Sequence, residues 1–254
     1  MTNARNNSSE LRQLRADVFL VEAGFFESRS AAQAAISTGR VSADGVVVTR
    51  ASQKIPAGSV IEANAAHPYV SRGGMKLAHG LESFGVSAAG KVCLDLGAST
   101  GGFTDVLLQR GAIHVTAVDV GTGQLHARLA TDGRVNNLQQ RDARSLTPGD
   151  LPAPPSLIVG DLSFVGLEKA LATPLSLASP AADLLVLFKP QFQVGRANIG
   201  RGGLVRNAAA TRAAESRFAQ WLAGAGWPVL GWTDSPIRGG DGNHERLVHA
   251  KQSR

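Results

Sequence analysis

The chain has 254 residues, of which 43% are hydrophobic and 18% charged, and its formal net charge is +6. This composition excludes a disordered or fibrous protein, and the length allows one α/β domain of about 180 residues with a small additional module. The single cysteine excludes a disulfide framework and a zinc site built on cysteines. The positive charge favours a polyanionic partner.

The start of the chain is polar and lacks the apolar stretch that a signal peptide carries. The longest aliphatic stretch, Leu184 to Phe188, is far too short to cross a bilayer. We therefore expect a cytoplasmic protein with no membrane partner.

The first 63 residues predict a small α+β module of two helices and a few short strands. Apolar residues recur at helical spacing over residues 11–23, and Ser30-x-x-Gln33 resembles a capping box that opens a second helix. Asp44-Gly45 is typical of a tight hairpin turn.

Part of this module resembles the RNA-binding module of the ribosomal protein S-four type. The resemblance lies in Ser28-Arg29-Ser30-x-Ala32-Gln33-x-x-Ile36-x-x-Gly39-Arg40-Val41, followed by Asp44-Gly45 and Ile55-x-x-Gly58. It implies that Arg15, Arg29 and Arg40 face RNA; the alternative is that they are ordinary solvated helix arginines. We place the module at residues 11–63, a linker at 64–68 and a second domain at 69–254.

The second domain is organised around a strand that breaks into a glycine loop and resumes as a helix, over residues 92–108. The spacing Gly97-x-x-x-Gly101-Gly102 differs from the G-x-G-x-x-G of dinucleotide sites, and no P-loop lysine follows. Asp95, inside the strand, suits a cationic ligand better than a phosphate. S-adenosylmethionine, with its ammonium and sulfonium groups, fits this pattern, whereas the alternative is a glycine-rich turn without a ligand.

A second predicted strand ends in Asp119, where a carboxylate can accept hydrogen bonds from both ribose hydroxyls. Asp142 follows the third predicted strand, where it either meets an adenine amino group or lies in a simple surface turn. The residues expected to bind S-adenosylmethionine are therefore Asp95, Gly97, Ala98, Ser99, Gly101, Gly102, Phe103, Asp119 and Asp142.

The remaining pattern alternates strands and helices, which predicts an α/β fold with a Rossmann-like, doubly wound and mostly parallel sheet. By analogy with methyltransferase sheets, we expect the last strand to be antiparallel. Strands are expected at 114–119, 135–140, 156–161, 182–189, 229–233 and 246–250, and helices at 102–110, 122–130, 166–178 and 208–224.

Charged residues mark three strand ends: Asp161, Lys189 and Glu245. With an antiparallel last strand all three meet at the edge of the sheet beside the glycine loop, and the start of the preceding helix brings Lys76 there. Two lysines and two acids in one cleft can perform base chemistry, and the alternative is a structural network of ion pairs. The scattered histidines predict no metal site.

Motifs across nearly the whole chain resemble the TlyA family, which is related to the FtsJ methyltransferases. They are Ser71-Arg72-Gly73-Gly74-x-Lys76-Leu77, Asp95-Leu96-Gly97-Ala98-x-x-Gly101-Gly102-Phe103-Thr104-Asp105, Asp161-x-Ser163-Phe164, Lys189-Pro190-Gln191-Phe192, Ser235-Pro236-Ile237 and Gly242-Asn243-x-Glu245. The resemblance implies S-adenosylmethionine-dependent methylation of the ribose 2′-hydroxyl of cytidines in ribosomal RNA, with Lys76, Asp161, Lys189 and Glu245 as a catalytic tetrad. Gln193 stands where the family usually has glutamate.

Residues 190–214 carry arginines and no acidic residue, and several glycines interrupt them. We interpret this segment as a mobile basic flap in which Arg196, Arg201 and Arg206 bind RNA phosphates, with a disordered connector as the alternative.

The sequence therefore predicts a methyltransferase that acts on ribosomal RNA or ribosomal subunits, without a metal. A monomer is expected, and neither the target nucleotide nor the subunit is specified. Two alternatives are a non-catalytic ribosome-assembly factor, which the intact tetrad disfavours, and a membrane-active haemolysin, which the lack of a strongly apolar segment disfavours.

Overall fold

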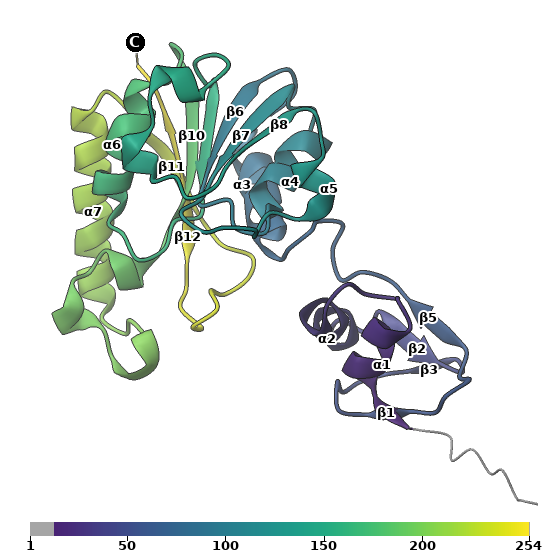
Figure 1. Cartoon of the computed structure of the whole chain (residues 1–254). Coiled ribbons are helices and arrows are strands. Elements are labelled where there is room, and N and C mark those ends of the chain that lie inside the picture. Colours follow the sequence, from purple (N-terminus) through teal and green to yellow (C-terminus); the bar gives the residue numbers. More distant parts are fainter. Residues whose placement is uncertain (1–12, 254) are drawn as a thin grey trace, which may run out of the picture. The chain divides into compact units, whose positions relative to one another are not determined.

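The computed structural model describes residues 13–253, and the chain divides into two compact units, Met1–Pro68 and Tyr69–Arg254. Figure 1 labels most helices and strands of both units. Each unit has its own hydrophobic core, so each is described separately below.

The first unit contains two helices and two small antiparallel sheets. The helices are α1 (Ala16–Glu22) and α2 (Arg29–Ser37). One sheet pairs β1 (Leu14–Arg15) with β4 (Lys54–Ile55), and the other has the order β3 (Val46–Val47), β2 (Val41–Ala43), β5 (Ile61–Ala63). Apolar side chains from the helices and strands form the core, among them Leu20, Ile36, Val41, Val48 and Ile55.

Two expected details of this unit are wrong, and one is confirmed. The first helix begins at Ala16 because the residues before it pair with β4, and Leu11 and Arg12 lie outside the described residues. Ser28, rather than Ser30, caps α2 by accepting a hydrogen bond from the Ala31 amide. The hairpin turn is confirmed, since Asp44 and Gly45 have φ of 51° and 77°.

The second unit is built on a seven-stranded sheet with the order β11-β12-β10-β9-β6-β7-β8. The strands from β10 to β8 in this order pair in parallel, and β12 is antiparallel to both of its neighbours, β10 and β11. This confirms the predicted fold class. The strands are β6 (Val92–Leu96), β7 (His114–Val118), β8 (Val135–Leu138), β9 (Leu157–Gly160), β10 (Asp183–Phe188), β11 (Val229–Asp234) and β12 (Arg246–Lys251).

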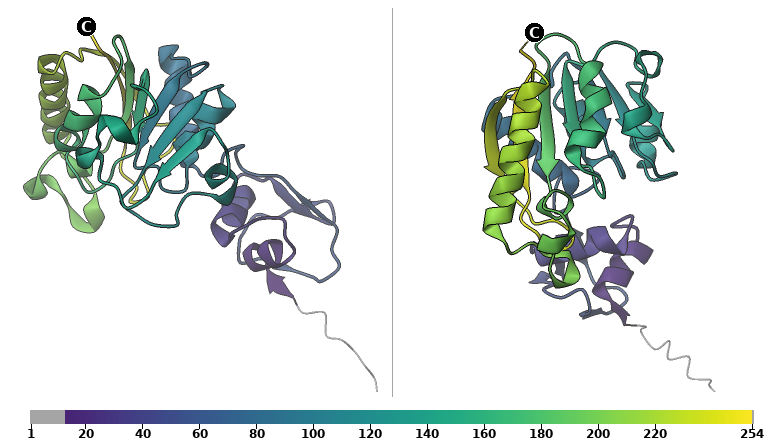
Figure 2. Two further views of the ribbon diagram at one scale, coloured as in Figure 1. Left: turned by 45° about the horizontal axis from the view of Figure 1, so that its top comes forward. Right: turned by 90° about the vertical axis from the view of Figure 1, so that its left-hand side faces the viewer.

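Helices cover both faces of this sheet, as Figure 2 shows. Apolar side chains of α3 (Gly73–Phe84), α4 (Gly102–Gln109) and α5 (Ala127–Ala130) pack in one core. Those of α6 (Leu167–Ser176) and α7 (Ala208–Gly224) pack in another. The six residues of β10 are all buried, which explains why the sequence there is an almost continuous apolar run.

The helix expected over 122–130 is the least accurate prediction in this unit. Only Ala127–Ala130 is helical, because Gly123 has a φ of 65° and the His126 side chain caps the helix by accepting from the Arg128 amide. Two short 3-10 turns, Ala143–Ser145 and Pro148–Asp150, follow β8 and were not predicted.

The strand register aligns the ends that carry polar residues. Leu96 of β6 pairs with Gly160 of β9, Gly160 pairs with Val186 of β10, and Phe188 at the end of β10 pairs with Arg246 at the start of β12. The residues that follow β6, β9 and β10 and those that precede β12 therefore meet at one edge of the sheet.

At the opposite end of the sheet, the buried carboxylate of Asp183 links β10 to side chains of neighbouring segments. Asp183 binds the Lys91 ammonium at 2.7 Å and the His249 ring at 3.0 Å, and hydrogen bonds from these two groups hold its pKa at about 2 despite burial. An aspartate in the unfolded chain has a pKa of about 3.9. Ionised Asp183 thus stabilises the fold above about pH 4, and this contribution is lost as the pH falls towards 2.

We predict that Asp183→Asn flattens the decline in unfolding free energy between pH 4 and pH 2 relative to the unaltered chain. Urea titrations followed by tryptophan fluorescence measure it, since all three tryptophans lie in this unit. Asp241→Asn is the matched control, because Asp241 is exposed and makes no ion pair with any described residue. The same acid dependence in Asp183→Asn and in the unaltered chain would contradict the assignment.

Candidate active site

The aligned strand ends bring four charged side chains together. Asp161 follows β9, Lys189 follows β10 and Glu245 precedes β12, while Lys76 lies in the first turn of α3. Both lysines and Glu245 are buried, with 8%, 8% and 4% of their surface exposed. Because buried charges are costly unless they are paired, their mutual distances determine whether this arrangement is stable.

The four side chains form a chain of ion pairs in which every charge has a partner. The Lys76 Nζ atom lies 2.6 Å from Glu245 Oε2 and 4.0 Å from Asp161 Oδ2. The Lys189 Nζ atom lies 2.6 Å from Asp161 Oδ1 and donates a hydrogen bond to Ser163 Oγ at 2.7 Å. Asp161 is thus shared by the two lysines, and the cluster, with two positive and two negative groups, is electrically balanced.

The glycine loop after β6 lies against this cluster. Gly97 has a φ of 76°, and a Cβ atom there would come within 2.9 Å of the Asp161 carbonyl oxygen. A Cβ atom on Gly102 would collide with the Ser71 hydroxyl and approach the Gly74 amide to 2.9 Å. Glycine at both positions therefore allows the loop and the starts of α3 and α4 to lie in contact.

Two cavities open beside the loop and share four lining residues, Gly97, Ser99, Asp161 and Ser163. The first, of about 320 Å³, is lined by Lys76, Lys189, Ala98, Gly102, Phe103, Arg72 and Arg238 among others. The second, of about 360 Å³, is lined by Asp119, Asp142, Val120, Arg144 and Phe164 among others. The charged cluster is therefore adjacent to a second, more apolar space.

Asp119 and Asp142 lie on the wall of the second cavity. The two carboxylate oxygens of Asp119 accept hydrogen bonds from the Ser99 and Gly121 amides, both at 2.8 Å, which fixes the loop to the end of β7. Asp142 accepts from the Arg144 amide and side chain, and these bonds lower its pKa. Each oxygen of Asp119 keeps a further lone pair with which it can accept a bond from a ligand.

Asp95 and Gly101, predicted at the cofactor site, lie away from the cavity walls. Asp95 is fully buried, and its Oδ2 atom accepts a bond from the Thr104 hydroxyl at 2.6 Å, while its Oδ1 atom has no hydrogen-bond partner among the described residues. A Cβ atom on Gly101 would collide with Leu129, so this glycine faces the core. A side chain at Gly101 would therefore meet the core rather than either cavity, and a role for this glycine in cofactor binding stays a prediction.

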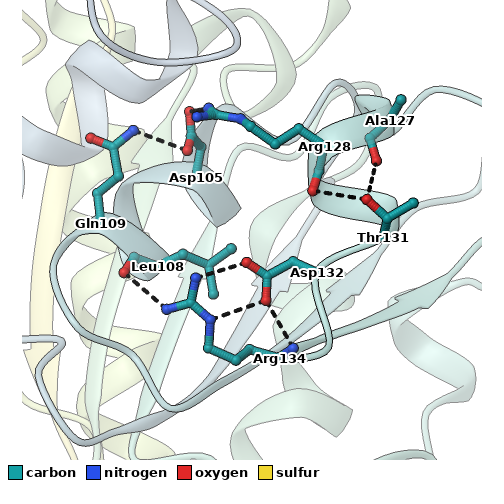
Figure 3. Close-up of polar contacts among 8 residues, drawn as sticks. All are labelled: Asp105, Leu108, Gln109, Ala127, Arg128, Thr131, Asp132 and Arg134. Atoms are coloured by element: carbon teal, nitrogen blue, oxygen red, sulfur yellow. Dashed lines mark hydrogen bonds and ion pairs between the residues drawn. The ribbon is translucent and has the colours of Figure 1, made fainter.

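Asp105, at the end of the same motif, lies in the first turn of α4 and joins this helix to neighbouring segments. Its carboxylate accepts bonds from Arg128 at 2.8 Å, from Gln109 at 3.0 Å and from the Val70 amide at 2.8 Å. Figure 3 shows the first two of these contacts. Asp105 thus joins three segments that surround the glycine loop.

One buried carboxylate holds two of the three arginines predicted to bind RNA in the first unit. Asp17 binds Arg15 Nε at 3.0 Å, Arg29 Nη2 at 2.8 Å and the Gln33 amide at 2.7 Å, and these donors lower its pKa well below the usual range. The Arg15 and Arg29 side chains keep 49% and 56% of their surface exposed. Arg40 is also exposed.

The basic segment after β10 is folded into short 3-10 turns, Pro190–Phe192, Arg196–Asn198 and Arg201–Gly203. Arg196, Arg201 and Arg206 are exposed on it. Gln193, which stands in place of the usual glutamate, lies outside both cavities, where its Oε1 atom accepts from the Leu167 amide at the start of α6.

Sequence reasoning assigned no role to several residues on the cavity walls, although their motifs were noticed. Ser163 binds Lys189, and Arg72 and Arg238 line the first cavity. Phe164 has a φ of 63° and is 91% exposed, and its ring centroid lies 5.1 Å from that of Phe192. Such an exposed aromatic side chain at a cavity mouth is a typical feature of a ligand-binding surface.

Between residues 13 and 253 no group of three or more His, Cys, Asp or Glu side chains is arranged to hold a metal ion. None of the helices in this range is long and apolar enough to span a membrane.

Comparisons with known proteins agree with this arrangement. Residues 69–252 match the model of the FtsJ-like methyltransferases, and residues 14–61 match that of the S4 domain. The 16S/23S rRNA (cytidine-2′-O)-methyltransferase TlyA of Mycobacterium tuberculosis is 41% identical over 93% of this chain and 89% of its own length. Hemolysin A of Brachyspira hyodysenteriae is 37% identical, over 93% and 99% respectively.

Among solved structures, a putative hemolysin from Streptococcus thermophilus superposes with a TM-score of 0.75 at 36% identity. The match covers 96% of this chain and 90% of that one. The likeness therefore extends over both units of the chain.

Burial of Asp95 leads to a prediction about stability. Desolvation raises the pKa of this carboxyl to about 7, above the value of about 3.9 of an unfolded aspartate. The protonated form is therefore favoured in the fold, and the stability that it contributes below about pH 4 is lost as the pH rises to about 7.

We predict that Asp95→Asn becomes more stable relative to the unaltered chain as the pH rises from 4 to 7, by up to about 1.4 kcal/mol per pH unit. Denaturant titrations followed by tryptophan fluorescence at pH 4, 5.5, 7 and 8 measure the difference. A difference in unfolding free energy that does not change with pH would show that Asp95 is ionised throughout.

Proposed function

The chain belongs to the FtsJ-like methyltransferases and, within them, to the TlyA family, and from this premise we propose that it transfers a methyl group from S-adenosylmethionine to the ribose 2′-hydroxyl of cytidines in ribosomal RNA. The observation that carries the proposal is the balanced cluster of Lys76, Asp161, Lys189 and Glu245, which borders the same loop as a second cavity large enough for a nucleoside.

The residues beside the loop fit S-adenosylmethionine. Asp119 and Asp142 offer carboxylate oxygens to the hydroxyl and amino groups of an adenosine, and Val120 offers apolar surface to its ring. Gly97 and Ser99, shared by both cavities, connect this space with the charged cluster. When bound, S-adenosylmethionine supplies a methyl group activated by a sulfonium.

The cluster can activate the acceptor hydroxyl. Lys189, in its unprotonated form, accepts the proton of the 2′-hydroxyl, and Asp161 and Ser163 hold its Nζ atom in place. Lys76 binds Asp161 and Glu245, so it fixes the position of Asp161 and balances its charge. Holding the hydroxyl oxygen in line with the methyl group accounts for a further share of the rate.

Exposed groups around the first cavity suit a polynucleotide. Every lysine and acid of the cluster is paired, whereas Arg72 and Arg238 make no ion pair with any described residue, so they leave uncompensated positive charge for RNA phosphates. At the second cavity, the exposed ring of Phe164 suits stacking on a nucleobase. In the first unit, Arg15, Arg29 and Arg40 add contacts with the backbone of ribosomal RNA.

The function is tested by incubating the purified protein with S-adenosylmethionine carrying a labelled methyl group and with ribosomal subunits from cells that lack the gene. We expect label at the 2′-oxygen of cytidine, located by nuclease mapping. Label on a base, or on protein alone, would contradict the assignment. Binding of S-adenosylmethionine without any transfer to RNA would instead favour a role in ribosome assembly.

We predict that Lys189→Arg binds S-adenosylmethionine and RNA but loses at least ~100-fold in single-turnover rate, the lower end of what a positioned base contributes. Arginine keeps the positive charge but remains protonated at working pH, so it cannot accept the hydroxyl proton. The rate of the unaltered enzyme should rise with pH, and that of the variant should not.

The matched control for this variant is Lys91→Arg, since Lys91 pairs with Asp183 and lines neither cavity. A Lys189→Arg variant with a near-normal rate and an unchanged pH profile would show that Lys189 only anchors charge. Lys76, Asp161 or water would then have to accept the proton.

A further inference from the structure

Asn243 belongs to a motif that the function above leaves without a role. It precedes Glu245 by two residues in the loop between β11 and β12, and it is 3% exposed. Its side-chain amide donates to the Gly203 carbonyl at 2.9 Å, and its Oδ1 atom accepts from the Val205 amide at 2.9 Å. One side chain thus binds both a donor and an acceptor of the basic segment.

These are the only hydrogen bonds that join residues 199–206 to a distant part of the described chain. The others made by this stretch stay within it or reach Arg196, such as Gly200 to Leu204 at 2.8 Å. Leu204 lies close to Gly242 in the same loop. Asn243 is therefore the polar link between residues 199–206, which include Arg201 and Arg206, and the loop that precedes β12.

The loop that holds the segment also holds the catalytic cluster. The Ser235 amide donates to the Glu245 carbonyl at 2.9 Å, and the Gly239 amide donates to the Asn243 carbonyl at 3.1 Å. The Glu245 side chain in turn binds Lys76. Asn243 thus lies between the exposed arginines of the segment and the site of the proposed reaction.

We propose that Asn243 is a positioning residue for RNA: it holds residues 199–206 of the basic segment against the Glu245 loop so that Arg201 and Arg206 bind the RNA backbone beside the methyl acceptor. The inference rests on the proposed function for its substrate. Fixing the segment in advance lowers the conformational entropy that RNA binding must remove, so the effect should appear in RNA affinity rather than in the chemical step.

Two variants remove the link from opposite sides. Asn243→Ala deletes both hydrogen bonds, whereas Val205→Pro removes the amide donor without a change in the sequence of the Glu245 loop. The preceding residue, Leu204, has φ of −79° and ψ of 132°, the extended conformation that a residue before proline prefers. Asn136→Ala is the matched control, since Asn136 also bonds a backbone carbonyl, that of Asp150 at 3.1 Å, but outside both cavities.

The first readout needs no RNA. Trypsin cleaves after arginine, and we expect cleavage after Arg201 and Arg206 to become about 10-fold faster in both variants, because the loss of one or two hydrogen bonds favours local opening. Asn136→Ala should be cleaved there at the rate of the unaltered protein. Unchanged protection in both variants would overturn the inference whether or not the protein methylates RNA.

The second readout is whether the variants change KM or kcat. We expect KM for ribosomal RNA to rise about 10-fold in both variants, with kcat within about 2-fold and with unchanged affinity for S-adenosylmethionine. A fall in kcat for Asn243→Ala alone, with Val205→Pro normal, would show that Asn243 acts on the Glu245 loop, which overturns the proposal. Faster cleavage with an unchanged KM would show that the segment is held but does not bind RNA, and this too would overturn it.

Discussion

The structure of the second unit depends on the mutual pairing of Lys76, Glu245, Asp161 and Lys189. Removing a single ionised group from water costs several kcal/mol, and breaking a buried pair typically costs about 3–5 kcal/mol. Four charges can be kept at the sheet edge only because each lysine contacts a carboxylate at 2.6 Å. The arrangement must therefore be assembled as a whole, and the four elements that carry it must be held in fixed register.

The antiparallel last strand is the topological condition for this assembly. Were β12 parallel to β10, its start would lie at the opposite edge, beside Asp183, and Glu245 could not reach Lys76. The observed register instead places Arg246 opposite Phe188, one residue from Lys189. A hairpin between β11 and β12 brings the intervening loop to the same edge, so Arg238 lines the first cavity.

The sequence was sufficient to predict an element and its position in the sheet wherever a strong local pattern coincided with a general rule of topology. Apolar runs ending in Asp161 and Lys189 predicted both strands and their common edge, since parallel strands end on one side. The placements of Asp95 and Gly101 depend on tertiary neighbours instead, because Thr104 faces Asp95 and Leu129 faces Gly101. The expected capping box fails for a similar reason, since the Gln33 side chain binds Asp17. No spacing in the chain specifies such contacts. The roles of the predicted catalytic and RNA-binding residues stay predictions.

The same physical arrangement recurs in each unit: a carboxylate of low exposure holds long cationic side chains. Asp17 binds Arg15 and Arg29 in the first unit, and Asp161 binds Lys189 in the second. A free arginine or lysine loses up to about 2 kcal/mol of side-chain entropy when it is fixed. Where a buried acid has already restricted the side chain, a phosphate or hydroxyl that binds its outer end meets a smaller entropic cost. The acid also neutralises one positive charge, which weakens the long-range electrostatic attraction of the site for any polyanion. The fixed side chains instead favour a ligand whose groups already lie at matching positions, as in a folded RNA.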